Sequence, residues 1–151
     1  MNDSTLREIH AAYLAALIDG RCSVSVSTEK RKPYGSTVHR LKLKVWFASA
    51  SAPSLFEWMD AEKQFQADLR RADSGLGKGY LLFRNKEAAK VWTAVWPHLR
   101  NPIRRQQAQE CFKFFRTQFG AGYGRRPERG FQETREDVRR ELLRLAEKEI
   151  A

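Results

Sequence analysis

The first apolar run of the chain has a helical period. Between positions 12 and 18, the bulky pairs Tyr13/Leu17 and Leu14/Ile18 are each spaced by four residues, so each pair lies along one side of a helix. We expect both pairs to face a core. Gly20 is expected to end the helix in the left-handed conformation that glycine adopts at low cost. The predicted helix therefore extends from about position 3 to position 19.

The pattern then changes to the period of two that is typical of strands. Residues 22–29 and 38–47 each alternate between polar and apolar positions, and a turn with Pro and Gly separates them. In the second strand, one face is apolar and the other has the residues Arg40, Lys42, Lys44 and Trp46. Three cations on one face repel each other unless solvent or an anion covers them. Both a solvated outer face and a polyanion-binding face fit this strand.

The remaining pattern predicts a second helix-strand-strand unit and more helices. We expect a helix from Pro53, strands at 64–72 and 80–84 joined by a Gly-rich turn, and helices at 88–96, 103–119 and 131–150. Two αββ units on one mixed sheet predict the α+β class. The predicted domains are a core at 1–120, a Gly/Arg-rich linker at 121–132, and a C-terminal helix at 133–151 that packs on or extends the same domain.

Composition indicates a globular protein with a polyanionic partner. The 28 Lys and Arg residues exceed the 18 acids by ten, and 42% of the residues are hydrophobic. Cys22 and Cys111 lack metal-site spacing and are expected to be reduced core thiols. No apolar run is long enough to span a membrane, and the N-terminus lacks the pattern of a secretory signal. We expect an intracellular protein located with the genome, neither secreted nor membrane-bound.

The stretch LAALIDGRCSVSV, residues 14–26, resembles the signature of the LAGLIDADG homing endonucleases. Leu14, Ala15, Leu17, Ile18 and Asp19 fit it, whereas Ala16 stands where glycine is usual. The segments 97–108 and 133–143 are similar to later parts of single-motif members, and the first includes a basic residue near the scissile phosphate; the register favours Arg104 over Arg105. The resemblance implies an αββαββα saddle over DNA, with additional C-terminal helices, that dimerises through the signature helix.

The resemblance fails at the family's metal-binding carboxylate, because that position is Arg21. A guanidinium stays protonated and has no lone pair for Mg²⁺. Asp19, two residues earlier, could hold a metal instead, but capping is its more common role at a helix end. Trp46 stands where active members often have a small polar residue. A tryptophan there would crowd out water or stack on a base or sugar. Alternatively, it only covers the end of the sheet. The predicted site is therefore degenerate, with no catalytic residue, metal or cofactor; its positions are Asp19, Arg21, Trp46 and Arg104.

The predicted binding surfaces follow from the same elements. Long polar side chains suit base edges and phosphates in a major groove. The predicted nucleic-acid-binding residues are Arg21, Lys30, Arg31, Lys32, Arg40, Lys42, Lys44, Trp46, Gln66, Arg70, Lys78, Tyr80, Arg84, Arg104 and Arg105. Small side chains let helices approach closely. The predicted homodimer interface comprises Ala12, Ala15, Ala16 and Asp19.

Three functions remain open from the sequence. The leading prediction is a catalytically inactive, homodimeric protein that binds double-stranded DNA, in a role such as regulation or chromosome organisation. The alternative is an active or weak site-specific endonuclease that uses Mg²⁺. The third is an RNA-binding or maturase-like protein, because some relatives act as intron maturases and a basic sheet also binds structured RNA.

Overall fold

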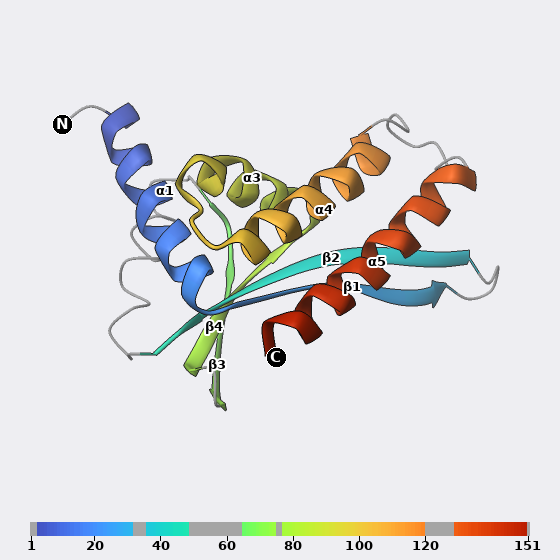
Figure 1. The fold of residues 1–151 in the computed structure, drawn as a ribbon, viewed down its shortest axis with the longest axis horizontal. Coiled ribbons are helices and arrows are strands. Elements are labelled where there is room, and N and C mark those ends of the chain that lie inside the picture. The colour runs from blue at the N-terminus through green and yellow to red at the C-terminus, as the bar shows by residue number, and fades with distance from the viewer. Residues whose placement is uncertain (1–2, 32–35, 49–64, 75–76, 120–128, 151) are drawn as a thin grey trace.

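The computed structural model describes residues 3–31, 36–48, 65–74, 77–119 and 129–150. Helices cover one face of a four-stranded sheet (Figure 1). The predicted helix from Pro53 lies outside the described residues. In chain order, the elements are α1 (Asp3–Gly20), β1 (Cys22–Arg31), β2 (Ser36–Phe47), β3 (Asp68–Ser74), β4 (Gly77–Arg84), α3 (Asn85–Val95), the 3-10 turn η1 (Trp96–His98), α4 (Pro102–Phe119) and α5 (Arg129–Ile150).

The sheet confirms the α+β class but is not mixed. Its strand order is β1-β2-β4-β3, and all three neighbouring pairs are antiparallel. The two hairpins meet through their second strands, β2 and β4, which run in opposite directions, so the prediction of a mixed sheet is wrong. Leu43 of β2 pairs with Val24 of β1 on one side and with Phe83 of β4 on the other, and all three side chains lie in the core beneath the helices.

Helix α1 packs on the core through a different stripe from the one predicted. Leu14 and Ile18 are fully buried as expected, together with Ala11 and Ala15, which gives the spacing i, i+3, i+4, i+7. Tyr13, by contrast, is 47% exposed, so its predicted core position is wrong. The stripe through which α1 contacts the core is therefore Ala11, Leu14, Ala15 and Ile18.

Gly20 does not adopt the expected left-handed conformation. The helix continues through Gly20, and the Arg21 N–H donates to the Leu17 carbonyl at 2.8 Å. A Cβ atom added at Gly20 would have no heavy atom within 4 Å. The space beside Gly20 is therefore open.

The predicted Gly-rich turn is partly strand. β3 begins at Asp68 and β4 at Gly77, so both are shifted from the predicted ranges 64–72 and 80–84. Gly79 pairs with Phe47 and Arg71, and an added Cβ would lie 2.4 Å from Phe47 Cζ. The glycine is required here because another side chain occupies the space above it.

The C-terminal helices complete the core. The predicted 88–96 helix is observed as α3 and ends at Val95, so that Pro97 lies in the following 3-10 turn. Helix α5 begins at Arg129, so the last four residues of the predicted linker are helical. Its Val138 and Leu142 belong to the same core cluster as the sheet.

Cys22 and Cys111 are buried, free cysteines. Burial raises the pKa of the Cys22 thiol to about 12, so the thiol stays protonated and unreactive at neutral pH. The prediction of reduced core thiols agrees with this placement. None of the described helices has the combination of length and apolar character needed to cross a membrane.

Candidate nucleic-acid interface

The face of the sheet opposite the helices presents the predicted cations. Paired residues of antiparallel strands point to the same face, and successive residues alternate. Since Leu41, Leu43, Val45, Leu81 and Phe83 point into the core, the intervening residues point the other way. We call this the open face; its long polar and aromatic side chains are Arg40, Lys42, Lys44, Trp46, Arg70, Lys78, Tyr80 and Arg84.

The register arranges these side chains in rows across the strands. Lys42 lies between Ser25 and Arg84, and Lys44 lies between Ser23 and Leu82. The next row places Trp46 beside Tyr80, which itself pairs with Arg70. The small serines on β1 leave the β2 lysines accessible from that side.

Arg21 lies at one end of this array. Its carbonyl accepts the Trp46 N–H at 2.9 Å, which continues the β1–β2 ladder by one residue beyond Cys22. The Arg21 side chain is exposed. The structure thus brings together Arg21 and Trp46, two of the predicted degenerate-site residues, at the junction of α1 and the sheet.

Two acids neutralise part of the open face. Glu29 Oε2 lies 3.3 Å from Arg40 Nη2, and Asp68 Oδ2 lies 2.8 Å from Arg84 Nη1 and 3.9 Å from Arg70 Nη2. All of these side chains are about half exposed, so each ion pair contributes little to stability. Their effect is to fix the orientation of the arginines.

Trp46 packs within the protein. Its ring centroid lies 4.7 Å from that of Tyr80, and Lys44 Nζ lies 4.8 Å from the Tyr80 centroid on the other side of the row. Trp46 is only 8% exposed, so little of its ring is available to stack on a base. This burial favours a tryptophan that covers the end of the sheet and excludes water there, over one that stacks on nucleic acid.

Asp19 joins the end of α1 to the start of α4. Its two carboxylate oxygens accept the backbone N–H groups of Arg100, at 2.9 Å, and Asn101, at 3.2 Å. Asn101 Oδ1 in turn accepts the Ile103 N–H at 2.9 Å, within the first turn of α4. The carboxylate therefore ties the end of α1 to the two residues that precede α4, and the side chain of Asn101 caps that helix. Among the described residues, there is no cluster of three or more His, Cys, Asp or Glu side chains that could hold a metal.

Arg104 does not lie on the surface predicted for it. Only 1% of it is exposed, and its Nη1 donates to Gln107 Oε1 at 3.0 Å and to Glu149 Oε2 at 2.9 Å. The C-terminal end of α5 covers it, which the sequence did not indicate. The predicted contact of Arg104 with a phosphate is therefore wrong for this structure, because the guanidinium is enclosed between two helices.

Arg105 also has an internal role. Its guanidinium stacks on the Trp96 ring at 4.2 Å from the centroid, and its Nη1 donates to the carbonyls of Trp96, at 3.4 Å, and Leu99, at 3.3 Å. These contacts satisfy carbonyl groups at the end of η1. The structure does not place Arg105 with the open-face cations.

The exposed face of α1 contains two of the four residues of the predicted interface, and Asp19 is half-buried beside the segment before α4. Ala12 and Ala16 are exposed, whereas Ala15 is fully buried in the core, so Ala15 cannot form an interface. Ile9 and Tyr13, which are 48% and 47% exposed, lie on the same side. Sequence reasoning missed both, although their spacing from Ala12 and Ala16 follows a helical stripe. We call Ile9, Ala12, Tyr13 and Ala16 the α1 stripe.

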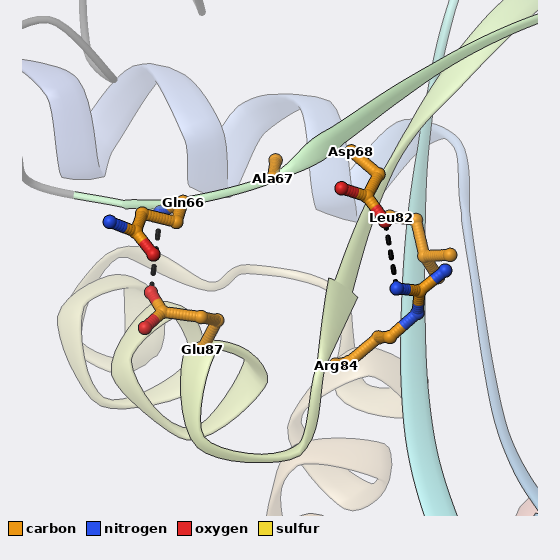
Figure 2. A pocket seen from close by; sticks show the side chains of 6 residues that line it. All are labelled: Gln66, Ala67, Asp68, Leu82, Arg84 and Glu87. Carbon is orange, nitrogen blue, oxygen red and sulfur yellow. Dashed lines mark hydrogen bonds and ion pairs between the residues drawn. The ribbon is translucent and has the colours of Figure 1, made fainter.

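Further predicted binding residues lie at the edges of the sheet. Lys30 is exposed near the end of β1, whereas Lys32 and the side chain of Arg31 lie outside the described residues. Gln66 is exposed just before β3, and its backbone N–H donates to Glu87 Oε2 at 3.2 Å. Figure 2 shows Gln66 and Glu87 on one side of a shallow pocket and the Asp68–Arg84 ion pair on the other side.

This arrangement defines an α+β protein with helices on one face of a four-stranded antiparallel sheet and basic residues on the other face. No protein-family model and no curated protein matches the sequence. Solved structures do match the fold. The homing endonuclease I-CvuI, in complex with a DNA target, aligns over 93% of this chain and 83% of its own, with a TM-score of 0.70 and 13% identity.

Two further homing endonucleases give the same result. I-TnaI aligns over 91% of this chain and 96% of its own, with a TM-score of 0.63 and 10% identity. The LAGLIDADG homing endonuclease I-GzeII, in complex with its DNA target, aligns over 89% of this chain and 43% of its own, with a TM-score of 0.51 and 10% identity. The chain has the fold of the LAGLIDADG homing endonucleases, as the resemblance of residues 14–26 predicts.

Proposed function

We propose that the chain binds double-stranded DNA through the open face of its sheet. The observation that supports this most directly is the register, which aligns Arg40, Lys42 and Lys44 of β2 with Arg84 of β4 on one exposed face. Two strands with long cationic side chains fit the width of a major groove. I-CvuI and I-GzeII, which share the fold, were solved in complex with DNA.

We further propose that the protein does not cleave DNA. Cleavage by two-metal chemistry needs carboxylates that hold a cation near the scissile phosphate. Arg21 is a cation at the position of the family's catalytic acid, and Asp19 directs both of its oxygens to backbone N–H groups. Trp46, whose backbone N–H donates to the Arg21 carbonyl, is only 8% exposed, which leaves little room for water around its ring. The proposed role is that of a binding protein, such as a regulator or a factor that organises the chromosome.

A homodimer would complete this surface. The α1 stripe exposes two small and two large apolar side chains, and the space beside Gly20 is open. A second copy packed on the stripe would cover Ile9 and Tyr13 and bring two open faces together across one duplex. Such a dimer would recognise a two-fold-symmetric site.

The test is a titration of duplex DNA at several salt concentrations, followed by selection from a random pool. We expect affinity to fall steeply with salt and the bound pool to contain a symmetric motif. Replacing Lys42 and Lys44 by Ala should lower the salt slope by about two, since each phosphate contact contributes about 0.9. The matched control replaces Lys90 and Lys113 by Ala; both lie on helices and pair with acids three residues away.

The outcomes separate the alternatives. An equal loss in both double variants would show that net charge, and not the open face, determines binding. Binding of structured RNA in preference to duplex DNA at matched salt would overturn the DNA assignment. Nicking of supercoiled plasmid with Mg²⁺ or Mn²⁺ that Asp19→Asn abolishes would overturn the proposed inactivity and establish an endonuclease.

A further inference from the structure

The Asp68–Arg84 pair lies at the β3 edge of the open face, and neither side chain belongs to the hydrophobic core. Asp68 pairs with Leu82 across β3 and β4, so Arg84, two residues beyond Leu82, is its diagonal neighbour on the same face. The carboxylate Oδ2 lies 2.8 Å from Arg84 Nη1. Both side chains are 48% exposed. The guanidinium is thus held at a fixed place while its surface remains accessible.

We propose that Arg84 reads a guanine in the major groove of bound DNA and that Asp68 is its positioning residue. The inference rests on the proposed function. Guanine presents O6 and N7 as two acceptors, and arginine is the side chain that most often binds them, through two parallel N–H groups. With Nη1 turned to Asp68, the edge formed by Nε and Nη2 remains directed away from the carboxylate.

The charge of the pair favours a base over a phosphate. Arg84 and Asp68 together have no net charge, which weakens the attraction for the phosphate backbone. The carboxylate repels phosphate oxygens directly beside Arg84, and the net positive charge of this group of three belongs to Arg70, whose Nη2 lies farther from Asp68 Oδ2, at 3.9 Å. A neutral base edge meets no such repulsion, and its acceptors can still bind the N–H groups of the guanidinium. Asp68 therefore converts a general phosphate-binding cation into a group suited to a base edge.

The surroundings of the pair keep Arg84 in place. Leu82 is almost fully buried and lines the pocket of about 190 Å³ between the pair and Gln66. It offers no polar atom that would compete for the guanidinium. Glu87, the other acid at this pocket, accepts the Gln66 N–H on the far side, as Figure 2 shows, and the acid that pairs with Arg84 is Asp68.

The experiment uses the full chain and the duplex selected from the random pool. We expect one guanine in each half-site whose replacement by 7-deazaguanine, which lacks the N7 acceptor, weakens binding of the unaltered protein about tenfold. Arg84→Ala should remove the preference for that guanine, and the same 7-deaza substitution should then have no effect. Asp68→Asn should keep binding but reduce discrimination at that guanine severalfold and raise the salt slope by about one, because Arg84 then acts as an unpaired cation.

The matched control is Arg71→Ala. Arg71 is an exposed cation of β3, the strand that also carries Asp68, but it pairs with Gly79 and so points to the other face of the sheet. We expect this variant to keep the preference for the guanine. If Arg84→Ala weakens all sequences equally and lowers the salt slope by about one, Arg84 is a phosphate contact and the inference is wrong. If neither the unaltered chain nor any variant binds duplex DNA, the proposed function itself is wrong.

Discussion

Arg104 of α4 and Glu149 of α5 form an ion pair in which the guanidinium is almost fully buried and the carboxylate is one-third exposed. Gln107 Oε1 accepts a further hydrogen bond from the same guanidinium at 3.0 Å. Removing one partner of a buried pair leaves the other charge without compensation. We expect Glu149→Gln to lower the free energy of unfolding by about 3 kcal/mol, the low end for such a pair because water reaches Glu149.

The measurement is urea denaturation at neutral pH. Glu147→Gln is the control, because Glu147 is exposed on the same helix and should change stability by less than about 0.5 kcal/mol. Equal shifts of the urea midpoint in the two variants would show that Glu149 stabilises the protein only through the net charge of α5 and not through its ion pair with Arg104.

Asp19→Asn tests the link that the carboxylate makes between the end of α1 and the residues before α4. The Asp19 carboxylate accepts hydrogen bonds from the backbone N–H groups of Arg100 and Asn101, which precede α4. The amide retains one oxygen acceptor and loses the negative charge, so we expect a loss of about 1 to 2 kcal/mol in thermal or urea unfolding. Addition of Mg²⁺ should not change the midpoint of the unaltered protein; a metal-dependent increase that Asp19→Asn removes would indicate a metal ligand.

Ala12→Arg tests the α1 stripe. Ala12 is exposed, so the longer side chain fits in the single chain and should change unfolding by less than about 1 kcal/mol. In a dimer, it would place a charge between two closely packed helices. We expect sedimentation equilibrium to report monomers at concentrations where the unaltered protein is dimeric.

The control for the α1 stripe is Gln109→Arg. Gln109 is also exposed, but it lies on α4. This variant should keep the dimer. A dimer that survives Ala12→Arg would place the interface on another surface.

Ionised Glu136 stabilises the folded protein, so the stability decreases at acid pH. Its hydrogen bonds to Arg139, with a further one to His39, lower the pKa of the carboxyl from 4.5 to about 2. The folded state therefore favours the ionised form, and the stabilisation is complete above about pH 4.5 and is lost as the pH falls toward 2. The unaltered protein should be more stable than Glu136→Gln at pH 6, and the difference should shrink between pH 5 and 2.

The comparison is made by urea denaturation at each pH. Glu133→Gln is the control, since Glu133 is exposed on the same helix. If the difference in unfolding free energy between the unaltered protein and Glu136→Gln stays constant down to pH 2, the pH dependence does not come from the Glu136 carboxyl.

Local patterns predicted the strands of the first hairpin and most helices because each has a simple period. The alternation in 38–47 determines which face of β2 is buried, and the structure confirms Leu41, Leu43, Val45 and Phe47 as core residues. The short motif at 14–26 predicted the fold through its resemblance to the LAGLIDADG signature. These features depend on neighbours in sequence.

The errors concern contacts between distant segments. Arg104 is buried because α5 crosses it 45 residues later, and no spacing within 97–108 contains that information. Ala15 and Tyr13 exchanged their expected exposures because the orientation of α1 depends on what it packs against. Gly79 resembles a turn residue in sequence, but it is a strand residue because Phe47 occupies the adjacent space.

The hydrogen bonds of Asp19 have a consequence for how the chain folds. They join positions that are 81 and 82 residues apart, so the end of the first helix acquires its partners only after most of the chain has been synthesised. During translation, residues 3–31 would be present without the backbone groups that Asp19 binds. Contacts of such high sequence separation slow folding, because a long loop must close before they form. We therefore expect the N-terminal helix and the start of α4 to become protected from hydrogen exchange together, late in refolding.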